Sequence, residues 1–167
     1  VVLDYQDNQS GTATIKLSAK EDGLLTNTAS HTFTVRVTNE NDRPTITGTP
    51  SVTMNEDTTY AFLVSDFLFS DADSNDNNAN TGNKALASII ITQIPLFGGV
   101  LKLGNNNVDN GDKITAVQLN NRELTYTPNS NLFSSGTAFA SFSYTVSDGA
   151  LSSSAPATMI INVAAVN

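Results

Sequence analysis

The chain has 167 residues, and its 8 Lys and Arg against 16 Asp and Glu give a formal net charge of −8. A negative surface repels phosphate backbones and anionic lipid, so neither nucleic acid nor a membrane surface is an expected partner. Its apolar runs are far shorter than the roughly 20 residues that cross a bilayer. Cysteine is absent, which excludes disulfides and thiolate chemistry, so any bound metal is expected to have oxygen ligands.

Apolar residues alternate with Ser, Thr and Asn in several segments, which is the pattern of half-buried β-strands. The clearest segments are 32–37, 101–103, 124–127, 142–146 and 159–163. Clusters of Asn, Gly and Asp separate them, and no window shows sustained helical periodicity. The sequence therefore predicts an all-β protein, an antiparallel sandwich of at least seven strands.

The chain also contains an internal repeat, because residues 3–41 resemble residues 124–167. Gly23 corresponds to Gly149 and Asn41 to Asn167, each 126 residues later. We therefore predict one complete module at 42–167, preceded at 1–41 by the C-terminal half of another. Half a sandwich leaves open edges and an uncovered apolar face. We expect it to dock along the complete module or, preferably, to form a homodimer by exchange between two chains.

The densest run of oxygen-bearing side chains is 70–78, which includes Asp71 and Asp73. Carboxylates on a loop suit calcium, which takes about 6 to 8 oxygen ligands. The run is not an EF-hand loop, since Asp76 and Gly82 stand where that motif needs Gly and Glu. A solvated polar loop is the alternative, and we prefer it beyond Asn75.

Residues suited to catalysis are sparse, so we expect no enzymatic activity. The one histidine, His31, lies on a Ser/Thr-rich strand and is expected to be exposed, which leaves the serine runs of the complete module without a base. Aromatic residues make up 7% of the chain and tryptophan is absent, so a sugar-binding cleft is not indicated. We expect the aromatic residues to form the core. A carbohydrate-binding platform is the alternative reading of Tyr60, Phe62, Phe67, Phe69, Phe139, Phe142 and Tyr144.

Several segments carry a family resemblance. The run Asn39-Glu40-Asn41-Asp42-Arg43-Pro44-Thr45 resembles the linker between cadherin repeats. Together with segments 55–58, 65–73, 124–128 and 144–149, it makes nearly the whole chain similar to the bacterial cadherin-like tandem repeats of large secreted and surface adhesins, including those of the RTX type. The segment 95–100 resembles a turn of that family, to which we assign a structural role. The resemblance implies a cadherin-like or Ig-like Greek-key sandwich.

The resemblance also implies calcium between successive modules. Its ligands would come from the linker, a Glu early in the following module, an Asp-x-Asp pair, and an acid at the base of the preceding module. Asn39 and Arg43 depart from the cadherin linker, so we expect one or two ions. The implied ligands are Asp22, Asn39, Asn41, Asp42, Glu56, Asp71 and Asp73, with Asp148 as the mirror of Asp22 facing a further module.

These observations lead to an expected function. We expect a calcium-braced structural repeat, a stiff spacer in an extracellular or surface adhesin of a bacterium, whose partners are neighbouring repeats of the same polypeptide. A calcium-dependent module that binds carbohydrate or protein is the first alternative. An accessory domain of a secreted enzyme is the second.

Overall fold

The computed structural model describes residues 2, 4, 10–20, 28–38, 40–75, 85–94 and 98–166. The chain divides into two units. The first, here called the hairpin unit, comprises Val1–Glu40 with Asn75–Thr81, and the second, the sandwich unit, comprises Asn41–Ser74 with Gly82–Asn167. The boundary at Glu40 and Asn41 lies within the run that resembles a cadherin linker.

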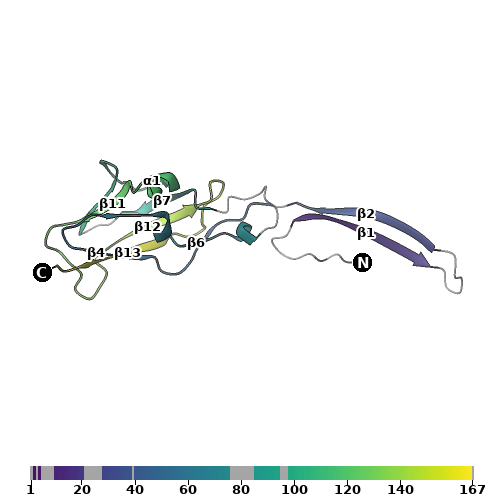
Figure 1. Cartoon of the computed structure of the whole chain (residues 1–167), viewed down its shortest axis with the longest axis horizontal. Coiled ribbons are helices and arrows are strands. Elements are labelled where there is room, and N and C mark those ends of the chain that lie inside the picture. The colour runs from purple at the N-terminus through teal and green to yellow at the C-terminus, as the bar shows by residue number, and fades with distance from the viewer. Residues whose placement is uncertain are drawn as a thin grey trace. The chain divides into compact units, whose positions relative to one another are not determined.

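The hairpin unit contains two ten-residue antiparallel strands, β1 (Gly11–Lys20) and β2 (Thr28–Val37), seen in Figure 1. Their register pairs Gly11 with Val37 and Lys20 with Thr28. Directly paired residues share a face of the ladder, so the apolar residues of both strands gather on one side and Thr, Ser, Lys and Arg on the other. His31 lies on β2 and is exposed, as expected.

The sandwich unit has two main sheets. The larger has the strand order β10-β7-β12-β13-β4, and the smaller has the order β5-β11-β8-β9. The strands of the larger sheet are β10 (Lys113–Thr115), β7 (Ser88–Gln93), β12 (Ala140–Ser147), β13 (Ala157–Ala164) and β4 (Ser51–Asn55). Those of the smaller are β5 (Tyr60–Ala61), β11 (Leu124–Pro128), β8 (Gly99–Leu103) and β9 (Asn106–Asn107).

An edge segment changes partners near the start of the sandwich unit. The short strand β3 (Thr45–Ile46) pairs antiparallel with β6 (Phe69–Ser70), whereas β4, a few residues later, pairs in parallel with β13. Gly48 lies between them with a φ of +66°, a left-handed conformation that glycine adopts without steric cost. The left-handed residue Gly48 thus separates two short strands of one segment that join different sheets.

The core lies between the two main sheets and is rich in aromatic rings. Phe62 and Phe142 meet edge to face at 5.4 Å between ring centroids, and Phe67 meets Tyr144 in the same way at 5.0 Å. All four side chains are buried, which confirms the expectation that they form the core. Burial alternates along β12 and β13, as the period-two pattern predicted.

Helices are few and short in the described residues, and the all-β prediction is confirmed. One α-helix, α1 (Ala116–Asn120), begins at a capping box in which the Thr115 side chain accepts from the Gln118 backbone and the Gln118 side chain accepts from the Thr115 backbone. Two 3₁₀ turns are η1 (Val64–Asp66) and η2 (Ala72–Asn75). Within the described residues, no helix has the length and apolar character needed to span a membrane.

Candidate metal site

Five oxygen-bearing residues gather where the sandwich unit begins, and we call them the acidic cluster. Asn41 and Asp42 are the first two residues of the unit. Asp71 follows β6 and Asp73 lies in η2, while Asp148 follows β12 at the start of the turn toward β13. Three segments far apart in the sequence therefore supply the cluster.

Asp148 is held by hydrogen bonds to both of its carboxylate oxygens. The backbone N–H groups of Ala150 and Leu151 each donate to Oδ1 at 2.7 Å. The side-chain amide of Asn41 donates to Oδ2 at 2.8 Å. The carboxylate thus orders the turn after β12 and fastens the start of the sandwich unit to that turn.

A second set of hydrogen bonds joins Asp42, Asp73 and Asp71. The backbone N–H of Asp42 donates to Oδ2 of Asp73 at 2.9 Å, and the backbone N–H of Asp73 donates to Oδ1 of Asp71 at 3.0 Å. The second bond closes a turn between residues two apart, a conformation that Asp favours. The Asp-x-Asp spacing therefore builds a local structure as well as supplying carboxylates.

The three central carboxylates are withdrawn from solvent. The exposed fractions of Asp71, Asp73 and Asp148 are 3%, 1% and 0%. Burial raises the pKa of Asp71, and the negative charges of Asp73 and Asp148 raise it further, against the lowering effect of the Asp73 backbone N–H. Burial also acts to raise the pKa of Asp148, but the hydrogen bonds from Asn41, Leu151 and Ala150 outweigh it, so this pKa is lowered.

These charges favour a cation. Burying like charges near one another is unfavourable, and the charges that shift the pKa of Asp71 are all negative. The arrangement is not yet a closed ligand shell, because among the described residues no three acidic or histidine side chains converge closely enough to hold an ion. The donors fit calcium by chemistry, since all are hard oxygens. Binding would require Asp71, Asp73 and Asp148 to approach one another, with the Asn41 amide turned to present its oxygen.

Glu56 lies away from this cluster. It follows β4, which runs parallel to β13, so it lies beside the C-terminal end of β13, whereas Asp148 precedes the N-terminal end. The eight residues of β13 separate the two by roughly 25 Å. The Glu56 carboxylate accepts from the backbone N–H of Val166 at 2.8 Å. The resemblance implied that Glu56 joins the linker acids, and the structure places it at the opposite end of its own module.

Asp148 also differs from the implied arrangement. As the mirror of Asp22 it was expected to face a further module, but it lies with Asn41 and Asp71. The strand pairing explains this position: β12 is antiparallel to β13 and β13 is parallel to β4, so the turn after β12 lies at the end of the sandwich where β4 begins. Asp22 and Asn39, the two other implied ligands, lie outside the described residues.

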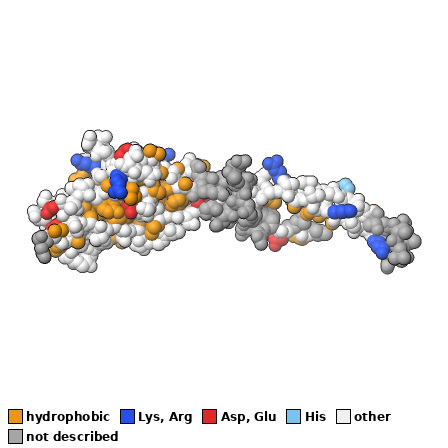
Figure 2. Space-filling model, viewed as in Figure 1, with side chains coloured by type: hydrophobic (Ala, Val, Ile, Leu, Met, Phe, Trp, Pro, Cys, Tyr) orange, Lys and Arg blue, Asp and Glu red, His pale blue; other side chains and the backbone are white. Residues whose placement is uncertain are grey.

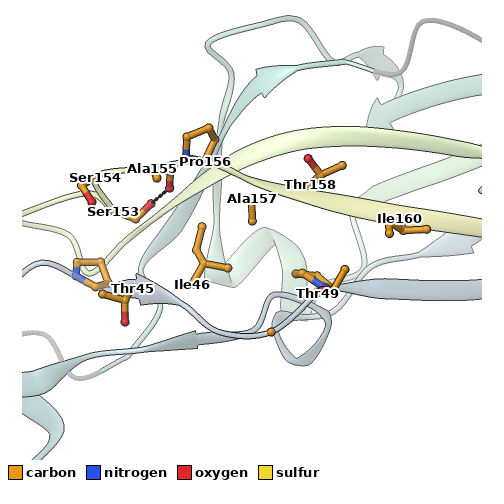
Figure 3. Close-up of a pocket in the computed structure, with 13 residues that line it drawn as sticks. Thr45, Ile46, Thr49, Ser153, Ser154, Ala155, Pro156, Ala157, Thr158 and Ile160 are labelled. Atoms are coloured by element: carbon orange, nitrogen blue, oxygen red, sulfur yellow. Dashed lines mark hydrogen bonds between the residues drawn. The ribbon is translucent and has the colours of Figure 1, made fainter.

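The described residues also form two surface grooves. One lies between residues 44–50 and 153–160 (Figure 3), where the Ser153 hydroxyl donates to the Ala155 carbonyl at 3.0 Å. Its lining residues are Pro, Thr, Ile, Gly, Ser and Ala, none with an acidic or basic side chain. The other is lined by Gln93, Phe139 and neighbouring serines. The Phe139 ring packs over Gly98, in keeping with a structural role for this aromatic residue.

Comparison with known families agrees with the sandwich. The sequence profile of the bacterial Ig domain matches residues 41–162, about the whole sandwich unit. The chain belongs to the bacterial Ig domain family. Bacterial Ig domains are commonly structural parts of extracellular or surface proteins. The match begins at Asn41, the residue that anchors the unit to Asp148.

The other comparisons give no further evidence about the function of this bacterial Ig domain. No curated protein matches the chain. Among solved structures, the chain is similar to an endo-fucoidan hydrolase of glycoside hydrolase family 107, at 18% identity and a TM-score of 0.37. The similarity covers 94% of this chain and 19% of the hydrolase, so the chain spans about a fifth of that enzyme's length. At this TM-score the similarity carries no argument about activity.

Proposed function

We propose that this bacterial Ig domain is a calcium-braced spacer repeat of a large extracellular adhesin. The proposal rests on one observation. The buried carboxylates of Asp71, Asp73 and Asp148 lie with Asn41 and Asp42, the first two residues of the sandwich unit. A divalent cation would cancel the repulsion among buried carboxylates and hold the linker to the sandwich in one step. The resemblance of segment 39–45 to cadherin linkers supports the same reading.

The bracing role follows from which parts of the chain the cluster joins. Asn41 and Asp42 belong to the linker segment, whereas Asp71 and Asp73 follow β6 and Asp148 follows β12 within the sandwich unit. In the absence of calcium, the connections between them are the hydrogen bonds from Asn41 and Asp42. Metal ligands drawn from both sides would replace these bonds with stronger contacts, so the linker would lose freedom. A string of such modules would then be stiff.

Backbone relaxation of the full chain by NMR tests this role. With calcium at a few millimolar, the amide order parameters of residues 38–42 are expected to rise to about 0.85, the value of rigid backbone. With EDTA they are expected to fall below those of β12 and β13. The matched control is Asp73→Asn, in which calcium is expected to have little effect. Equal order parameters with calcium and with EDTA in the unmodified chain would contradict the bracing role.

A further inference from the structure

The hairpin unit has an apolar face that the described residues leave largely open. Leu17 is 47% exposed, and Ile15, Phe33 and Val35 are only partly buried. Figure 2 shows hydrophobic side chains at the surface of this hairpin. Both outer edges of the β1–β2 pair also lack a neighbouring strand within the described residues. An isolated two-stranded hairpin is only marginally stable in water, so these surfaces call for a partner.

The register of this hairpin matches that of β12 and β13 in the sandwich unit. Ile15 pairs with Phe33 as Phe142 pairs with Met159, and Ala13 pairs with Val35 as Ala140 pairs with Ile161. Leu17 and His31 correspond in the same way to Tyr144 and Ala157. Residues 31–35 of β2 therefore correspond to residues 157–161 of β13, each 126 positions later, and over this stretch the correspondence holds for the pairing as well as for the sequence.

The centre of the matching face of β12 and β13 is buried in the sandwich unit. Phe142, Met159 and Tyr144 are at most 1% exposed. Two of the side chains that bury this face are Phe62, which contacts Phe142, and Phe67, which contacts Tyr144. The edges are covered too, because β7 pairs antiparallel with β12 and β4 pairs in parallel with β13.

From this correspondence we infer that the β1–β2 hairpin is the closing hairpin of a second Ig-like module, and that its partner is a set of strands of the kind formed by residues 42–123. That partner would place a β7-like strand antiparallel to β1 and a β4-like strand parallel to β2. Aromatic side chains at the positions of Phe62 and Phe67 would then cover Ile15 and Leu17. This inference does not depend on calcium.

A second copy of the same chain is a poorer source of the partner strands. Its residues 42–123 already have β12 and β13 as a closing hairpin, and these are joined to them covalently. An intramolecular hairpin acts at an effective concentration in the millimolar range, which a separate chain does not reach in dilute solution. The partner is therefore expected to be a half-module that has no closing hairpin of its own.

A chimera tests the inference with the complete chain. A second copy of residues 42–123 is placed directly before residue 3, so that it can pair with the hairpin. Amide exchange in β1 and β2 is expected to slow by about a hundredfold or more relative to the unmodified chain, as for a buried sheet. Phe33→Asp in the chimera is expected to abolish this protection. Thr34→Asp, on the polar face of the same strand, is the matched control and is expected to preserve it.

A second version of the chimera tests whether poor core packing alone could leave the hairpin unprotected. Ile15 and Leu17 are smaller than the Phe142 and Tyr144 that residues 42–123 normally cover, so the chimera begins with an underfilled core. Ile15→Phe combined with Leu17→Tyr restores those side chains and is expected to increase the protection. Fast exchange of the hairpin amides in both chimeras would overturn the inference. So would a dimer of the unmodified chain with protected hairpin amides that Phe33→Asp dissociates, because the occupant would then be a second copy.

Discussion

The side-chain amide of Asn41 donates a 2.8 Å hydrogen bond to Asp148, a residue 107 positions further along the chain. This bond fixes the first residue of the Ig domain to the turn between β12 and β13. It also brings the linker to the end of the sandwich that holds Asp71 and Asp73. The linker and the carboxylates are thus connected by hydrogen bonds, so a substitution at one of these residues is expected to alter the hydrogen bonding of the others.

The calcium response is expected to depend on Asp42 and Asp73. Replacing both by Asn removes two carboxylates, while the Asn oxygen at position 73 can still accept from the backbone N–H of residue 42. Calcium is then expected to raise the melting temperature by less than half of its effect on the unmodified protein. The double variant without metal is expected to remain folded, because Asn at position 73 keeps the hydrogen bond that this buried side chain accepts. Unfolding of this variant without metal would mean that these residues are part of the core structure.

Asp71→Asn is expected to stabilise the metal-free protein at neutral pH. The raised pKa of Asp71 means that its ionised form is disfavoured in the folded state, so its charge costs stability above the folded pKa. The gain from Asn is therefore expected at pH 7 and should disappear as the pH falls toward the ordinary carboxyl value of 3.8. Urea unfolding in EDTA across this pH range measures it. A variant less stable than the unmodified protein at pH 7 would contradict the charge argument.

Asp148→Asn is the matched comparison, and the opposite sign is expected. The pKa of Asp148 is lowered, so its ionised form contributes stability above the unfolded pKa and loses it as the pH falls through the folded pKa. The Asn variant is therefore expected to be less stable at pH 7, and the difference should shrink in acid. Unfolding free energy measured against pH for both variants separates repulsion at Asp71 from hydrogen bonding at Asp148. If both substitutions changed the stability with the same sign and the same pH dependence, the two carboxylates would share one role.

The alternation of apolar and polar residues was sufficient to predict the sandwich and its aromatic core, because burial on one face of a strand leaves a period of two in the sequence. It did not predict helix α1, whose five residues are too few for a helical period and whose signal is the cap at Thr115 and Gln118. The positions of Glu56 and Asp148 were also missed. They depend on strand direction and pairing, which the order of residues does not specify by itself.

Tyr144 provides a test of the core. Its ring is completely buried against Phe67 and Phe142, so Tyr144→Ala is expected to cost about 3 to 5 kcal/mol in unfolding free energy. Its buried hydroxyl lacks a hydrogen-bond partner among the described residues. Tyr144→Phe is therefore expected to be neutral or to stabilise by about 1 kcal/mol. A large loss with Phe would reveal a role for the hydroxyl.

Gly99 is expected to be irreplaceable for steric reasons. A Cβ there would collide with the carbonyl oxygen of Thr127 and with the ring of Tyr126, which β11 presents to β8. Gly99→Ala is expected to cost more than about 2 kcal/mol by chemical denaturation, since the backbone cannot move aside without breaking the ladder. Gly104→Asn is the control, because the space around Gly104 is open and Asn tolerates its φ of +60°. Equal stability of the two variants would contradict the steric argument.

The most direct test of the calcium-braced spacer is calorimetric unfolding of the full chain with calcium and with EDTA. For a dissociation constant near 0.1 to 1 mM, usual for extracellular calcium modules, a few millimolar calcium is expected to add about 1 to 2 kcal/mol of stability. The melting temperature should then rise by about 5 °C in the unmodified chain. An unchanged melting temperature from zero to about 10 mM calcium would contradict calcium binding at the acidic cluster.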